Sequence, residues 1–137
     1  MKIMFLSLLA VLPFVPVNAN SLSRAYVYRV DSALAGSEII TGRSSTTRDH
    51  GGAWMRIQTD DVGYGNNPQA RLLGNALREI KTEPLCNSHG SLAPCNRGTV
   101  VGYRRTWDAS GHQGGNFEYM VIPNGTGGPV RLNFQVR

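Results

Sequence analysis

Residues 130–137, VRLNFQVR, alternate strictly between apolar and polar side chains. The apolar side chains are those of Val130, Leu132, Phe134 and Val136, and the polar ones are those of Arg131, Asn133, Gln135 and Arg137. Successive side chains of a β-strand point to opposite faces of the sheet. The alternation therefore predicts a strand with one face toward a core and the other toward solvent.

Similar runs, rich in β-branched and aromatic residues, recur along the chain between turns rich in Gly, Pro and Asn. The predicted strands cover residues 23–30, 37–41, 53–59, 98–107 and 116–122, whereas residues 60–68 and 108–115 are predicted to form turns or loops. About seven short strands joined in this way predict an all-β fold, specifically a small antiparallel β-sandwich.

Residues 69–80 fit two patterns. Their apolar side chains recur at the spacing of a helix, at positions Leu72, Leu73, Ala76, Leu77 and Ile80. Gly74 interrupts that spacing, however, and the sequence from Leu73 to Ala76 resembles a tight hairpin turn. We therefore favour two strands here, residues 70–73 and 76–84, over a helix.

The N-terminal residues are typical of a secretory signal peptide. Lys2 precedes the uncharged apolar run 3–17, and small residues at Val17 and Ala19 favour cleavage after Ala19. The alternative, an uncleaved anchor, is disfavoured because a membrane-spanning helix needs ~20 apolar residues. We expect residues 1–19 to be removed and residues 20–137 to form one secreted domain, extracellular or periplasmic, without stable membrane insertion.

The charge pattern constrains the partner. The formal net charge is +5, which becomes +4 once Lys2 is removed with the signal peptide. Lys81 is then the only lysine, and the arginines are scattered without a basic run. A nucleic-acid-binding surface requires a basic stripe with interleaved aromatic residues, so we expect no nucleic-acid partner. An extracellular protein or glycan is the expected target, and we expect a monomer.

Cys86 and Cys95 enclose a short segment, CNSHGSLAPC, that Gly90 and Pro94 can turn. Export places the chain in an oxidising compartment, where such a pair forms a disulfide. A zinc site would need more ligands than these two cysteines and His89 provide. The sequence predicts a Cys86–Cys95 disulfide and no metal or cofactor.

The densest polar chemistry lies in Arg48-Asp49-His50, followed by Gly51 and Gly52. An aspartate beside a histidine can orient the ring and keep it basic, which is the logic of a general base. Asp49 and His50 are therefore the candidate catalytic residues, with Arg48 as a binding residue. The alternative is structural, because Asp49 can cap a turn and the glycines can take positive φ.

Further candidate binding residues are Asp60, Asp61, Tyr64 and Asn66, which follow the next predicted strand. Their oxygen atoms also suggest calcium, although the order matches no EF-hand and a polar turn explains it equally well. Ser44 to Thr47 precede His50, but no G-x-S-x-G nucleophile motif occurs in the chain.

Five blocks follow one another along the chain: STTRDHGG at 45–52, VGYGNNP at 62–68, VGY at 101–103, WDASG at 107–111 and GNFEY at 115–119. Together with the closing strand they resemble the small secreted YolA-like proteins of Bacillus and Pseudomonas, a domain family of unknown function. The resemblance implies an exported, compact domain whose cysteine pair lies in a variable loop. It implies no activity, cofactor or catalytic residue.

A shorter resemblance covers YVYRVDS at 26–32, which is similar to the first strand of pertussis-like ADP-ribosyltransferase toxins. There Arg29 would contact NAD, but the chain lacks the Glu-x-Glu pair of those enzymes and is shorter than their fold. We expect a non-enzymatic binding or effector module that acts outside the cell. The alternative is a small secreted hydrolase or toxin that uses Asp49 and His50.

Overall fold

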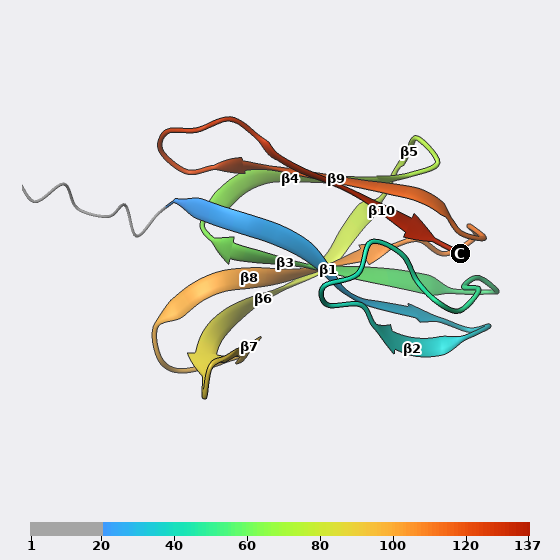
Figure 1. Cartoon of the computed structure of the whole chain (residues 1–137), viewed down its shortest axis with the longest axis horizontal. Coiled ribbons are helices and arrows are strands. Elements are labelled where there is room, and N and C mark those ends of the chain that lie inside the picture. Colours follow the sequence, from blue (N-terminus) through green and yellow to red (C-terminus); the bar gives the residue numbers. More distant parts are fainter. Residues whose placement is uncertain (1–20) are drawn as a thin grey trace, which may run out of the picture.

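The structure, a computed structural model, describes residues 21–137, in which ten β-strands and no helix are present (Figure 1). The strands are β1 (Leu22–Ser32), β2 (Gly36–Ile39), β3 (Met55–Gly63), β4 (Gly65–Leu72), β5 (Asn75–Ala76), β6 (Arg78–Ser88), β7 (Ser91–Pro94), β8 (Val100–Asp108), β9 (Gly115–Pro123) and β10 (Val130–Val136). The predicted signal peptide lies outside the described residues.

The strands form two antiparallel sheets. Sheet A has six strands in the order β2-β1-β3-β8-β6-β7, and sheet B has four in the order β10-β9-β4-β5. The predicted all-β fold is confirmed. The strands outnumber the predicted seven or so because β5 is separate from β6 and because the segment between the cysteines contains a strand of its own, β7.

The core lies between the sheets and follows from the alternation of each strand. Val30, Ile57 and Trp107 project from sheet A, and Phe117 and Phe134 are among the residues that face them from sheet B. As predicted for the closing strand, Phe134 and Val136 are buried while the intervening polar side chains are exposed.

The prediction of a turn over residues 60–68 is wrong. β3 continues to Gly63 and β4 begins at Gly65, so that Tyr64 alone connects sheet A to sheet B. The positive φ of Gly63, 107°, allows the sharp change of direction. The charged pair Asp60-Asp61 remains in the strand because two arginines of the neighbouring strand β8 neutralise it: Arg104 lies opposite Asp60, and Arg105 donates to Asp61 from the next position.

The segment 69–80 forms strands, as favoured above, rather than a helix. β4 and β5 are joined by a two-residue turn in which Leu73 and Gly74 both have positive φ, 50° and 77°. Such a turn matches the twist of a hairpin. After Ala76 the chain crosses back to sheet A and continues as β6.

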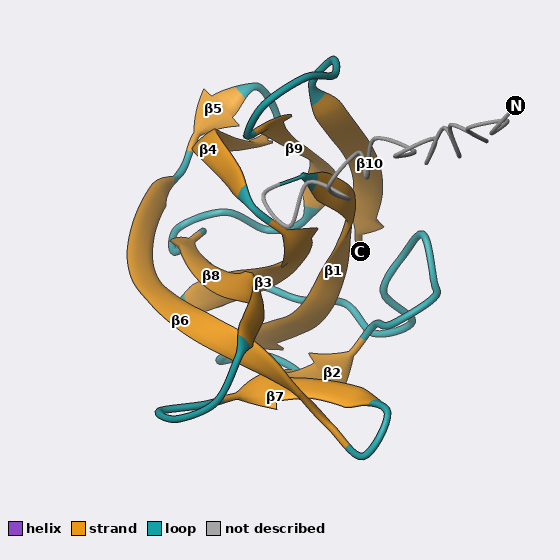
Figure 2. Ribbon diagram, turned by 90° about the vertical axis from the view of Figure 1, so that its left-hand side faces the viewer, coloured by secondary structure: helices purple, strands orange, loops and turns teal. Residues whose placement is uncertain are grey.

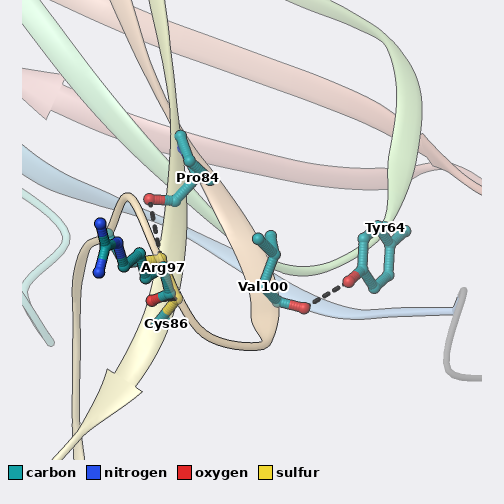
Figure 3. Close-up of a disulfide and its surroundings, with 6 residues drawn as sticks. Tyr64, Pro84, Cys86, Arg97 and Val100 are labelled. Atoms are coloured by element: carbon teal, nitrogen blue, oxygen red, sulfur yellow. Dashed lines mark hydrogen bonds between the residues drawn. A yellow bond between two sulfur atoms is a disulfide. The ribbon is translucent and has the colours of Figure 1, made fainter.

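The predicted disulfide between Cys86 and Cys95 is confirmed, with the two Cα atoms 5.7 Å apart (Figure 3). It bridges β6 to the end of β7, and His89 and Gly90 form the turn between these strands. The segment between the cysteines is therefore a β-hairpin closed by a covalent bond.

Sheet A curls into a half-barrel. In Figure 2, β3 and β8 lie toward sheet B, whereas β2 and β7 lie on the far side, so the concave face points away from sheet B. That face carries polar side chains, among them Gln58, Asp60, Arg104 and Thr106, which the curl buries. Ligand-binding sites form mostly in concave surfaces, so the concave face of sheet A is a candidate site.

Candidate functional site

His50 lies in the loop between β2 and β3, and only 2% of the residue is exposed. Its Nδ1 atom lies 2.9 Å from Oγ of Ser32, at the end of β1, and its Nε2 atom lies 3.0 Å from Oε1 of Glu38 in β2. We call Ser32, Glu38 and His50 the loop anchor, because they fasten the β2–β3 loop to the first two strands.

The partners of His50 fix its hydrogen bonds. A carboxylate only accepts hydrogen bonds, so the N–H group of His50 is at Nε2 and donates a hydrogen bond to Glu38. Nδ1 accepts a hydrogen bond from the hydroxyl of Ser32. The same hydroxyl oxygen accepts from the backbone N–H of Ala35 at 3.1 Å. Serine, histidine and acid thus stand in the order of a catalytic triad.

Glu38 is the most heavily bonded member. It accepts from the backbone N–H of Thr47 at 2.7 Å, from the Thr47 hydroxyl at 3.0 Å and from the backbone N–H of Arg48 at 3.1 Å. Burial alone would raise the pKa of Glu38, but these bonds and the bond from His50 outweigh it and lower the pKa from 4.5 to about 2. The carboxylate is therefore ionised at neutral pH.

The loop anchor has the geometry of a structural cluster. Ser32 is only 1% exposed, so its hydroxyl does not face solvent where a substrate would arrive. An active site needs its nucleophile at the surface of a pocket. Ser32 and Glu38 are absent from the sequence-based candidates because both lie more than ten residues from His50 and no local pattern links them.

The structure does not bring Asp49 and His50 together. The side chain of Asp49 is 79% exposed, and its Oδ1 atom lies 3.8 Å from Nε of Arg137. Arg48 is used structurally, since its guanidinium donates to the backbone oxygens of Ala35 at 2.8 Å and Ser37 at 2.6 Å.

Asp60 and Asp61 lie on opposite faces of β3. On the concave face, Asp60 accepts two hydrogen bonds from Arg104, at 2.8 and 3.0 Å, and the guanidinium lies 3.5 Å from the centre of the Tyr28 ring. Both charged residues are buried. The pair is a bidentate ion pair, the geometry in which arginine binds a carboxylate most strongly.

On the other face, Asp61 lies between the sheets. It accepts from the hydroxyl of Tyr119 at 2.7 Å and from Nε of Arg105 at 3.1 Å, and Arg105 also donates to Glu79 at 3.1 Å. Burial raises the pKa of Asp61 despite these bonds. Since the two aspartates point apart and each faces an arginine, they do not form the oxygen-lined loop that calcium requires.

Tyr64 and Asn66 lie far from His50. The Tyr64 hydroxyl donates to the backbone oxygen of Val100 (Figure 3), and Nδ2 of Asn66 donates to Oδ1 of Asn124 at 2.7 Å. β1 pairs with β3 so that Gly63 lies opposite Leu22, at the other end of the strand from Ser32. The stretch 44–67 therefore spans both ends of the sandwich and does not close into one pocket (Figure 1).

The concave face of sheet A holds a cavity of about 300 Å³, which we call the polar basin. Its polar lining consists of Arg29, Asp31, Arg56, Gln58, Lys81 and Thr106. Strand register explains the grouping, since Gln58 pairs with Arg29 and with Thr106, and Thr106 pairs with Lys81. The basin therefore consists of one row of side chains across four strands. Asp31 and Arg56, which pair with each other on β1 and β3, form a second row beside it.

Gln58 is the unusual member of the basin. It is 8% exposed, and its Nε2 donates to Oγ1 of Thr106 at 3.2 Å. Its Oε1 is the buried side-chain polar atom that has no hydrogen-bond partner among the residues the structure describes. Buried polar atoms are nearly always bonded, so an unbonded one inside a cavity suggests an absent partner. Sequence reasoning missed Gln58, since it assigned the residue only to a strand face.

A second cavity, of about 440 Å³, lies on the outer face of sheet B. It is lined by side chains of β4, β9 and β10, among them Arg71, Glu118, Arg131 and Asn133. These side chains are exposed, and none of the described residues that line this cavity has a buried side-chain polar atom without a hydrogen-bond partner. The polar basin is thus the better candidate site.

Residues 21–137 contain no helix that is long and apolar enough to span a membrane. No cluster of three or more His, Cys, Asp and Glu side chains in this part of the chain is arranged to hold a metal ion.

Comparison with known proteins identified the family. No curated protein and no solved structure matched the chain significantly. Among protein families, residues 13–135 matched a domain of unknown function, DUF4879. This match covers all ten strands except the last residue of β10, and so includes both the loop anchor and the polar basin. The chain therefore belongs to the DUF4879 family of domains of unknown function.

Proposed function

We propose that the protein is an exported, non-enzymatic binding module that acts outside the cell through the polar basin. The observation that carries this proposal is the unpartnered Oε1 of Gln58, buried in a cavity that three cationic side chains and one carboxylate line. The signal-peptide pattern and the disulfide support export. The order of the sequence blocks supports a place among the YolA-like secreted members of the family.

The test is a binding screen with the mature chain, residues 20–137, immobilised and exposed to a glycan array and to intact bacterial cells. We expect retention on at least one surface, and loss of retention when Gln58→Leu removes the unpartnered atom. Asp49→Asn serves as the control, because Asp49 is exposed and does not line the polar basin. This variant should bind normally. Absence of retention on every surface would contradict the proposal.

The second candidate is a small secreted hydrolase or toxin. The observation that favours it is the order of hydrogen bonds in the loop anchor, with Ser32 as nucleophile and His50 as base in place of the predicted Asp49–His50 pair. A fluorophosphonate probe distinguishes the two functions, because it labels only activated serines. We expect no labelling. Labelling of Ser32 that disappears in His50→Ala would establish the hydrolase instead.

A further inference from the structure

We propose that the ligand of the polar basin is an acidic sugar, that is, a carboxylate-bearing saccharide unit such as a uronic acid. This inference rests on the proposed binding function and adds the chemical class of the ligand. Three features of the basin carry it: an excess of positive charge, an amide whose oxygen has no partner, and a wall that combines polar and apolar groups.

The charge favours an anion. Arg29, Arg56 and Lys81 line the basin with only one carboxylate, Asp31. That carboxylate is already occupied, since Oδ2 accepts from Nε of Arg29 at 3.0 Å and Oδ1 accepts from the Ser37 hydroxyl at 2.5 Å. The lining provides no second carboxylate for Arg56 or Lys81; outside the lining, Glu83 pairs with Lys81 at 3.1 Å and Asp108 lies opposite Arg56 on β8.

Arg56 is the cation best placed to meet a ligand. Within residues 21–137 it forms no salt bridge at 4.0 Å or less, whereas Arg29 is paired with Asp31 and Lys81 lies 3.1 Å from Glu83. The Arg56 guanidinium lies 5.7 Å from the centre of the exposed Trp54 ring. Its planar fork of N–H donors matches the two oxygens of a carboxylate.

The amide of Gln58 requires more than an anion. A carboxylate or sulfate group accepts hydrogen bonds but donates none, and therefore cannot satisfy a carbonyl oxygen. A hydroxyl group both donates and accepts, so it satisfies whichever end of the amide faces the cavity. The ligand thus carries hydroxyl groups as well as a negative charge.

The size and the remaining wall agree with a sugar unit. A volume of about 300 Å³ lies at the small end of the ~300–1,000 Å³ typical of ligand pockets. Ile80 adds a half-exposed apolar surface to the lining. Pyranose rings present C–H groups on their faces and hydroxyl groups at their edges, and so match a cavity with one apolar wall and several polar ones.

The experiment is a titration of the mature protein with sodium galacturonate, galactose and sodium sulfate, followed by heteronuclear NMR. We expect saturable shifts around Gln58 and Thr106 with galacturonate, and affinities at least ~10-fold weaker with galactose and with sulfate, since galactose lacks the negative charge and sulfate lacks a hydroxyl donor. Arg56→Gln should weaken galacturonate binding by a similar ~10-fold or more. Arg97→Gln removes the same charge outside the basin and should leave the affinity unchanged.

Arg56 is exposed, so Arg56→Gln tests the site without the risk of unfolding that Gln58→Leu carries, and its melting temperature confirms the fold. Equal binding of galactose and galacturonate would overturn the role of charge. Equal binding of sulfate would overturn the role of hydroxyl groups. If galacturonate does not bind while the protein is still retained on cells or glycans, the acidic sugar is wrong and the binding module stands. If nothing binds in either experiment, the proposed function itself fails.

Discussion

The loop anchor and the polar basin are both polar clusters with buried members on sheet A, yet their hydrogen bonding differs. In the loop anchor both ring nitrogens of His50 are bonded, and Glu38 accepts from Thr47, Arg48 and His50. In the basin, Gln58 bonds to Thr106 through one end of its amide and to nothing through the other. We interpret a cluster whose hydrogen-bond donors and acceptors are all bonded within the chain as structural. We interpret a cluster with an unbonded buried acceptor as a ligand-binding site.

This comparison predicts the largest effect at Glu38. Glu38→Gln removes a buried charge on which several donors converge and turns an N–H₂ group toward some of them, so we expect a loss of ~3–5 kcal/mol in the free energy of unfolding. Urea denaturation followed by tryptophan fluorescence measures it. The control is Asp49→Asn, next to His50 but exposed, with an expected change below ~0.5 kcal/mol. Similar losses in the two variants would show that the loop anchor is not structural.

The adjacent aspartates of β3 sharpen the comparison. Asp60→Asn leaves the buried Arg104 without its bidentate partner, so we expect a loss of ~3 kcal/mol or more. Asp61→Asn leaves Arg105 paired with Glu79 and keeps an oxygen that accepts from Tyr119, so we expect only ~1–2 kcal/mol. The measurement is again urea denaturation, with the two variants compared under one condition. An equal or larger cost for Asp61→Asn would contradict this ranking.

The pKa of Glu38 predicts how the loop anchor responds to acid. Its pKa in the folded protein is about 2, below the ordinary 4.5, so the folded state binds the proton less readily than the unfolded state. The stability that this carboxylate contributes is therefore fully present above pH 4.5 and declines as the pH falls toward 2. The difference in unfolding free energy between the native protein and Glu38→Gln should narrow over that range. If the difference does not change with pH, the hydrogen bonds to Glu38 do not lower its pKa in the folded protein.

Much of the fold was predictable because it depends on local pattern. The alternation of residues 130–137 predicted β10 and its buried face, and the spacing of Cys86 and Cys95 predicted the disulfide. The turn predicted over 60–68 failed because Gly63, Gly65 and the residues 66–68, Asn-Asn-Pro, are typical of turns in sequence. Asp60 and Asp61 fit a strand because Arg104 and Arg105 of β8 donate to them, which no local pattern shows.

The candidate site was less predictable because it depends on strand register. His50 was identified as a polar residue of interest, but its partners Ser32 and Glu38 lie on other strands. Gln58, Thr106 and Lys81 become neighbours only when β3, β8 and β6 pair side by side. No single stretch of sequence contains that row, and the curl of sheet A that buries it has no local signature.

Among substitutions of buried side chains, the one with the smallest expected effect on stability is the most informative. Gln58→Leu removes an amide of which only one end is bonded, so the lost bond to Thr106 is offset by the removal of an unsatisfied buried atom. We expect a change within ~1 kcal/mol in either direction, measured by urea denaturation beside Glu38→Gln. A loss as large as that of Glu38→Gln would mean that Gln58 is structural after all, and that its free end is bonded by a permanent water molecule. A Gln58→Leu protein that is stable but no longer binds its ligand would instead show that the two clusters have different roles. The loop anchor would stabilise the fold, and the polar basin would bind the ligand through Oε1 of Gln58.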